Sequence, residues 1–179
     1  MIYFLIGFKS CGKSVIGHRL AEMLETEFVD LDHLIENWYE QKMGQRMSFR
    51  DIYHKLGDGW FRQMEQVALH QIDARGSMVI SVGGGTLMNG RNLRVLKDNG
   101  KVVYIVVEPK VLYERIMKNG IPAFFDPEDP RTSFDELYED RMPIYETMAD
   151  YRVDTTGLNI EQSAKKMYDI IQGAKPSDC

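Results

Sequence analysis

The chain has 179 residues, with 27 acidic and 22 basic side chains and a formal net charge of −5. Apolar residues make up 44% and charged residues 27%, as in ordinary globular proteins, and the length suits one sizeable domain. The acidic balance argues against nucleic acid as a partner. No apolar stretch has the length of a membrane span, and no secretory signal pattern opens the sequence. We therefore expect a cytoplasmic enzyme that binds neither nucleic acid nor membrane.

Short apolar runs alternate with segments of helical periodicity along the chain. Residues 2–6 form the first run, which is typical of a buried parallel strand. We expect further strands at 27–30, 78–82, 102–107 and 151–154, and helices at 13–24, 32–43, 48–74, 89–98, 109–118, 134–148 and 160–173. This alternation predicts an α/β fold of three layers, a five-stranded parallel sheet with helices on both faces.

Two segments interrupt the alternation. Residues 32–75 are helical in pattern throughout and too long for one crossover, so we expect a helical subdomain there. Residues 119–133 hold three prolines, which predicts a long surface loop of the kind that often forms a lid. A disordered insertion is the alternative, although Phe124 and Phe125 favour packing. The rest, 1–31, 76–118 and 134–179, would form the core of a single domain.

Residues 7–14 carry the clearest motif. They read Gly-Phe-Lys-Ser-Cys-Gly-Lys-Ser and match the phosphate-binding pattern G-x-x-x-x-G-K-[ST], between a predicted strand and a predicted helix. Loop amides and a helix N-terminus there favour an anion, whereas a plain glycine-rich turn is the weaker alternative. Lys13 is expected to reach the β- and γ-phosphates, and the Ser14 hydroxyl to bind Mg²⁺. The expected nucleotide contacts are Ser10, Cys11, Gly12, Lys13, Ser14 and Val15.

The two cysteines, Cys11 and Cys179, lie in the phosphate loop and at the last position. We expect no structural disulfide between them, in keeping with a reducing compartment. Cys11 precedes a predicted helix, where thiols can be reactive, so a redox role is the alternative to a neutral loop residue.

Asp30-Leu31-Asp32 ends the second predicted strand, which we place beside the first. Ligands of open parallel sheets bind beyond the carboxyl ends of the strands, and strand alternation would turn both aspartates the same way. Mg²⁺ needs few protein ligands, so one carboxylate near the loop suffices. Asp32 could instead only cap the next helix, but capping does not require Asp30, which favours a functional pair.

Three further patterns are weak when taken singly. Arg62 and Glu65 would share a helix face, either in a site or as an exposed ion pair. Residues 83–85 are three glycines directly after a strand, which suits a closely approached backbone or a flexible turn. Arg141, four residues before Tyr145, would by itself be a surface arginine.

In their order and spacing these motifs resemble the shikimate kinases, small P-loop kinases related in fold to the nucleoside monophosphate kinases. The resemblance runs from Ile2 to about residue 172. It implies transfer of the ATP γ-phosphoryl group to the 3-hydroxyl of shikimate, with Mg²⁺ as cofactor, by a monomer. A planar guanidinium suits the carboxylate of such a substrate.

The resemblance also implies roles for individual residues. Asp30 would serve Mg²⁺ with Ser14, and Asp32 would hold the substrate hydroxyls and assist deprotonation. Arg62 and Arg141 would bind the substrate carboxylate. Gly83, Gly84 and Gly85 would also belong to the substrate site, with Gly84 touching the substrate. Arg115 stands where the family often has an arginine on the nucleotide side.

The sequence departs from the family at three points. Ile121 precedes Pro122, where the lid usually carries an arginine aimed at the transferred phosphate. No arginine lies near Leu158 to hold the adenine, and Ser10 stands where glycine is common. We expect Lys118 or Arg131 to replace the lid arginine and place Arg131 with Lys13 and Asp32 in the catalytic set. A kinase of another hydroxy acid such as gluconate, and a non-catalytic nucleotide- or shikimate-binding protein, are the alternatives.

Overall fold

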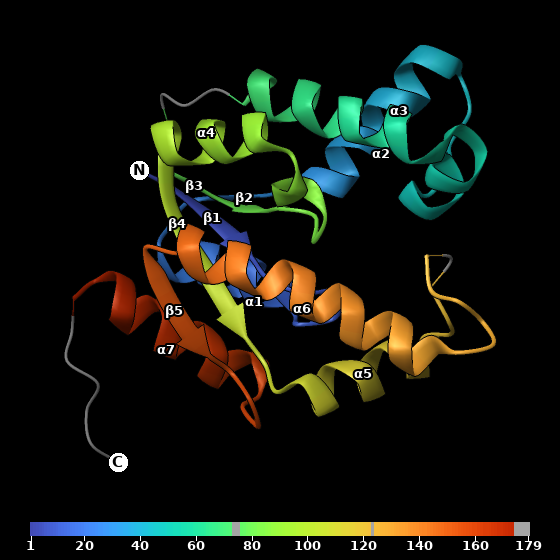
Figure 1. Ribbon diagram of the computed structural model, residues 1–179. Coiled ribbons are helices and arrows are strands. Elements are labelled where there is room, and N and C mark those ends of the chain that lie inside the picture. The colour runs from blue at the N-terminus through green and yellow to red at the C-terminus, as the bar shows by residue number, and fades with distance from the viewer. Residues whose placement is uncertain (73–75, 123, 174–179) are drawn as a thin grey trace.

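The computed structural model describes residues 1–72, 76–122 and 124–173, so Cys179 lies outside it. A five-stranded parallel sheet runs through its centre in the order β2-β3-β1-β4-β5, which confirms the expected α/β architecture (Figure 1). The strands are β1 (Ile2–Ile6), β2 (Glu27–Asp30), β3 (Met78–Ser81), β4 (Gly100–Val106) and β5 (Tyr151–Asp154).

Helices cover the sheet. They are α1 (Lys13–Met23), α2 (Leu31–Met43), α3 (Phe49–Gln71), α4 (Gly90–Asn99), α5 (Pro109–Lys118), α6 (Pro130–Met148) and α7 (Ile160–Ile171), with a short 3-10 turn η1 at Thr86–Met88. Helices α1 and α7 pack together against one face, and α4 and α6 contact β4 from the other (Figure 1). Helices α2 and α3 pack against each other and reach past the carboxyl ends of the strands. No helix of the described residues is both long and apolar enough to cross a membrane.

The position of β2 differs from the sequence prediction. Strand β2 pairs with β3 and lies at the edge of the sheet, so β3 separates it from β1. The burial of side chains accounts for this order: Val79 and Ile80 of β3 are fully buried, whereas Glu27 of β2 is exposed and suits an edge. Because all strands run parallel, Asp30 still ends at the same sheet edge as the phosphate loop.

Two helix boundaries also differ. Helix α6 begins at Pro130, four residues earlier than predicted, so the loop before it spans 119–129 and not 119–133. Its start has ordinary signals that the proline-rich composition concealed: the Asp129 side chain accepts from the Thr132 N–H, and Pro130 occupies the first turn. The long helix predicted over 48–74 ends at Gln71 and breaks at Gly57, where φ is 80°.

An aromatic cluster fixes α6 to the phosphate loop. Phe134 of α6 is fully buried, and its ring lies 5.3 Å from that of Phe8 in the loop and 5.4 Å from that of Tyr113 in α5. It also stacks on Tyr138 at 5.7 Å. The rigid aromatic contacts therefore join the helix after the lid to the segment that should hold phosphate.

Phe134→Ala should lower the free energy of unfolding by about 4 kcal/mol, because it leaves a cavity between three packed aromatic rings. Phe124→Ala is the matched control, since the Phe124 ring is 46% exposed. Urea unfolding followed by circular dichroism measures both. Equal losses for the two variants would contradict the packing role of Phe134.

Candidate active site

The backbone of the phosphate loop adopts conformations that few residues tolerate. Gly7 and Gly12 have φ values of 147° and 100°. A Cβ atom on Gly7 would lie 2.8 Å from the Ile105 carbonyl oxygen. Ser10 also has a positive φ, 65°, which explains why glycine is common at that position in the resembling family. The serine keeps the loop shape although it occupies a backbone region that favours glycine.

Lys13 lies folded over this loop. Its Nζ donates to the carbonyl oxygens of Gly7 at 2.9 Å and Phe8 at 3.1 Å, which fixes the positive charge above the loop. The buried Cys11 thiol lies 3.8 Å from the same nitrogen and fills the space under the loop. Burial of Cys11 agrees with a packing role and offers no open path for a redox partner.

Ser14 and Asp30 come together as expected for a magnesium site. Ser14 Oγ donates to Asp30 Oδ2 at 2.6 Å, across the gap between α1 and the end of β2. Mg²⁺ binds hydroxyl and carboxylate oxygens and keeps several waters, so this pair fits it. The described residues contain no group of three or more His, Cys, Asp or Glu side chains that could hold a metal ion.

The residue that caps α2 differs from the one considered in the sequence analysis. Asp30, not Asp32, caps α2, since Asp30 Oδ1 accepts from the Asp32 N–H at 3.1 Å. The strand ends at Asp30, so Asp32 takes its direction from the first turn of a helix and not from strand alternation. Asp30 therefore has two structural partners, and Asp32 is the side chain that capping leaves free for substrate.

The Asp32 carboxyl lines the cavity described below and has an unusual environment. Burial raises its pKa to about 7, and the neighbouring Asp30 and Glu65 carboxylates act in the same direction. Lys13 and Lys9 oppose them. Its proton affinity therefore suits exchange of a proton with a substrate hydroxyl near neutral pH.

Glu65 orders Arg62. Only 1% of Glu65 is exposed, and it accepts from Arg62 Nη1 at 2.7 Å and from the Thr86 hydroxyl. Arg62 Nε also donates to Asp58 at 3.1 Å. The alternative of an exposed ion pair is wrong, because a buried carboxylate needs its hydrogen-bond partners.

Two of the three glycines make room for these charges. A Cβ atom on Gly85 would lie 2.6 Å from Arg62 Nη2, and one on Gly83 would lie 3.0 Å from Glu65 Oε1. Neither position has a positive φ, so close packing and not backbone freedom requires glycine there. The plain flexible turn is therefore the wrong interpretation of this segment.

The third glycine lies beside Arg141. A Cβ atom on Gly84 would lie 3.4 Å from Arg141 Nη1, and the Tyr145 hydroxyl donates to the Gly84 carbonyl. The Arg141 guanidinium lies 5.8 Å from the centre of the Phe8 ring. Its Nε is buried and has no hydrogen-bond partner within residues 1–72, 76–122 and 124–173. The Arg141 side chain lines the cavity described below, and a planar guanidinium group there suits an anionic ligand.

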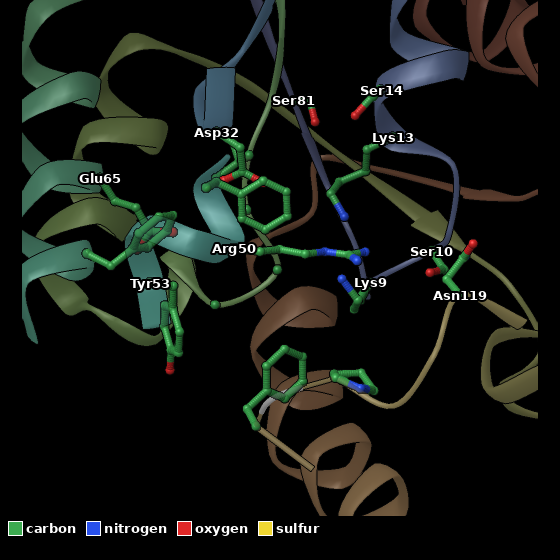
Figure 2. A pocket seen from close by; sticks show the side chains of 18 of the residues that line it. Lys9, Ser10, Lys13, Ser14, Asp32, Arg50, Tyr53, Glu65, Ser81 and Asn119 are labelled. Atoms are coloured by element: carbon green, nitrogen blue, oxygen red, sulfur yellow. The ribbon is translucent and has the colours of Figure 1, made fainter. Parts of the chain in front are cut away.

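These side chains surround one cavity of about 650 Å³. Figure 2 shows Lys9, Lys13 and Ser14 entering it from the phosphate loop and α1, and Asp32, Arg50, Tyr53 and Glu65 from α2 and α3. Gly83, Gly84, Gly85, Arg62 and Arg141 also line it. The loop before α6 contributes Asn119, Gly120, Ile121, Pro122 and Phe124.

Three of the expected cations are not among the residues that line this cavity. Arg131 is on α6, where its Nε pairs with Asp135 at 2.8 Å and its guanidinium lies over the Tyr113 ring. Lys118 is exposed at the end of α5, and Arg115 is half-buried on the same helix. Lys9 and Arg50 do line the cavity, and the sequence analysis missed both. Lys9 occupies a variable position of the loop motif, and Arg50 belongs to no motif.

The fold and the site define a P-loop kinase that acts on a small acid. The phosphate loop and Ser14, which pairs with Asp30, line the cavity, and the Arg62 and Arg141 guanidinium groups lie near the glycine triplet.

Comparison with known proteins specifies the family. The family model described as shikimate kinase matches residues 9–172. Shikimate kinase of Thermodesulfovibrio yellowstonii is 32% identical over 163 residues, which cover 91% of this chain and 90% of the relative. The structure of shikimate kinase from Acinetobacter baumannii, solved in complex with shikimate, is 30% identical and superimposes with a TM-score of 0.84 over 98% of this chain and 95% of the other. The chain belongs to the shikimate kinase family, ATP-dependent enzymes that phosphorylate a hydroxyl group of shikimate.

A gluconokinase from Sinorhizobium meliloti is more distant. It is 17% identical to this chain, with a TM-score of 0.57 over 96% of this chain and 92% of the other. This likeness shows a shared fold alone.

Gly85→Ala should raise the KM for shikimate at least tenfold, because the new methyl group would displace the Arg62 guanidinium from its pairing with Glu65. Gly59→Ala is the control, since a Cβ atom there meets nothing within 4 Å. Steady-state kinetics at saturating ATP measures both variants. An unchanged KM in Gly85→Ala would contradict the role given to the glycine.

Proposed function

We propose that the chain transfers the γ-phosphoryl group of Mg²⁺-ATP to the 3-hydroxyl of shikimate, giving shikimate 3-phosphate and ADP. The observation that carries the proposal is that Arg62 and Arg141 line the same cavity as Lys13. The planar guanidinium groups of these two arginines suit the carboxylate of the acceptor. Family membership supports the same substrate.

The residues divide the reaction between them. The bond between the γ-phosphorus and the bridging oxygen breaks, and its electron pair leaves with ADP. The shikimate oxygen forms the new bond to phosphorus, and its proton passes to the Asp32 carboxylate. Lys13 neutralises charge on the β- and γ-phosphates, which is the main demand of phosphoryl transfer.

Ser14 and Asp30 would hold Mg²⁺, which supplies charge neutralisation on the phosphates when it is bound. Residues 119–129 would act as a lid, because Asn119, Gly120, Ile121, Pro122 and Phe124 of this segment line the cavity without belonging to a helix or strand. The proposal includes action as a monomer in the cytoplasm, since every residue assigned a role belongs to one chain and both substrates are small molecules.

A coupled ADP-release assay tests the function. With Mg²⁺-ATP, shikimate should give turnover at least 100-fold above the rate without acceptor, and gluconate should not, because polar groups of a site built for one acceptor are left unpaired by another. Turnover with gluconate but not with shikimate would show that gluconate is the phosphoryl acceptor. Absence of turnover with either, in a protein that binds ATP, would favour the non-catalytic alternative.

Asp32→Asn should reduce kcat about 100-fold and raise the melting temperature of the ligand-free protein. The first effect follows from loss of the proton acceptor. The second follows because burial disfavours the Asp32 charge and the Asp30 and Glu65 carboxylates repel it, and the neutral amide removes both penalties. Assay and thermal unfolding on the same preparation measure the two effects. A lower melting temperature would show that the Asp32 charge stabilises the fold.

A further inference from the structure

Two cationic side chains without an assigned role line the cavity that contains Lys13. Lys9 belongs to the phosphate loop, and Arg50 lies in the first turn of α3. Figure 2 shows the nitrogen-bearing ends of Lys9, Lys13 and Arg50 pointing toward one another. A cation in the first turn of a helix opposes the helix dipole, so Arg50 gains nothing from its position in α3.

Neither side chain is neutralised by a carboxylate. Arg62, Arg131 and Arg152 each form an ion pair with a neighbouring carboxylate. Across residues 1–72, 76–122 and 124–173, no such pair or side-chain hydrogen bond involves Lys9 or Arg50. Both lie 6.0 Å from the centre of the Phe49 ring, one from the loop and one from α3.

The surroundings of Lys9 show the resulting repulsion. Burial lowers the pKa of Lys9, and the charges of Arg50 and Lys13 lower it further, whereas Asp32 acts in the opposite direction. Three converging cations without paired carboxylates form a site that an anion stabilises. Lys13 is the phosphate lysine of the loop, so the anion expected between these groups is the terminal phosphate of the nucleotide.

The lid leaves that phosphate without an arginine. Ile121 lines the same cavity at the position where the family usually has one, and its side chain is apolar. Arg131 pairs with Asp135 of its own helix, lies over the Tyr113 ring of α5 and does not line the cavity.

We propose that Arg50, assisted by Lys9, stabilises the transferring phosphoryl group in place of a lid arginine at Ile121. The inference rests on the proposed function. While the phosphorus leaves the ADP oxygen and bonds to the shikimate oxygen, whose proton goes to Asp32, negative charge lies on the three phosphoryl oxygens. Arg50 and Lys9 neutralise that charge. The helical segment that binds the acceptor thus also supplies the cation for transfer.

Kinetics of Arg50→Ala and Lys9→Ala test the roles. Arg50→Ala should lower kcat about 100-fold and change the KM for shikimate less than about threefold, because Arg50 contacts the phosphoryl group, more strongly in the transition state than in bound ATP, and does not contact the acceptor. Lys9→Ala should lower kcat about tenfold. Arg46→Ala is the matched control, since Arg46 is an exposed arginine just before α3 that does not line the cavity; it should retain wild-type kinetics.

A rescue separates catalysis from structure. Adding Ile121→Arg to Arg50→Ala should recover at least about tenfold in kcat, because the guanidinium returns to the cavity from the lid side. A merely structural role of Arg50 in α3 would give no recovery. The competing assignment is Arg131. If Arg131→Ala lowers kcat 100-fold while Arg50→Ala leaves kcat unchanged, the inference is overturned.

Nucleotide binding gives a readout that needs no acceptor. Calorimetry with Mg²⁺-ATP and Mg²⁺-ADP should show that Arg50→Ala weakens ATP about tenfold and ADP less than twofold, because ADP lacks the contacted phosphate. Absence of wild-type turnover with shikimate would refute the proposed function, and the ratio of the ATP and ADP dissociation constants would still test the role of Arg50. If this ratio is unchanged in both Arg50→Ala and Lys9→Ala, the inference is overturned.

Discussion

The buried carboxylate of Glu65 is the constraint on which the acceptor half of the site depends. A charge with 1% exposure must be neutralised and hydrogen-bonded, and its partners come from two separate elements, Arg62 on α3 and Thr86 in η1. This requirement joins the helical subdomain to the segment after β3. It also fixes the Arg62 guanidinium so closely to Gly85 that no side chain fits between them. The glycine triplet is thus a consequence of packing around an ion pair.

The phosphate half of the site depends on a different constraint, the shared direction of the strands. Because β1, β3 and β2 run parallel, the phosphate loop, the glycine triplet and Asp30 all follow carboxyl ends at one edge of the sheet. The Ser14–Asp30 hydrogen bond crosses this edge, although β3 separates the two strands. Phe134 then holds α6, and with it Arg141, against Phe8 of the same loop.

The distribution of charge explains how one cavity can take two anionic groups. Arg62 and Arg141 are proposed to bind the acid, and Glu65 limits the excess positive charge beside Arg62. Lys9, Lys13 and Arg50 also line the cavity, and their mutual repulsion is relieved only in part by Asp32. In the proposed arrangement, Arg50 of α3 supplies the cation that the lid lacks at Ile121.

The sequence by itself determined the elements whose signals are local. The loop at residues 7–14, the apolar runs of the five strands, and the Arg62–Glu65 and Asp30–Asp32 spacings could be recognised because each depends on neighbours in the chain. Tertiary structure decided the place of β2 at the sheet edge, whereas the capping role of Asp30 and the start of α6 at Pro130 have local signals that the predicted boundaries overlooked. It also decided which cations face the cavity, turning Arg131 toward Asp135 and bringing Arg50 to Lys9. A side chain's partners across 40 residues depend on packing between elements, and no pattern of spacing within one element contains that information.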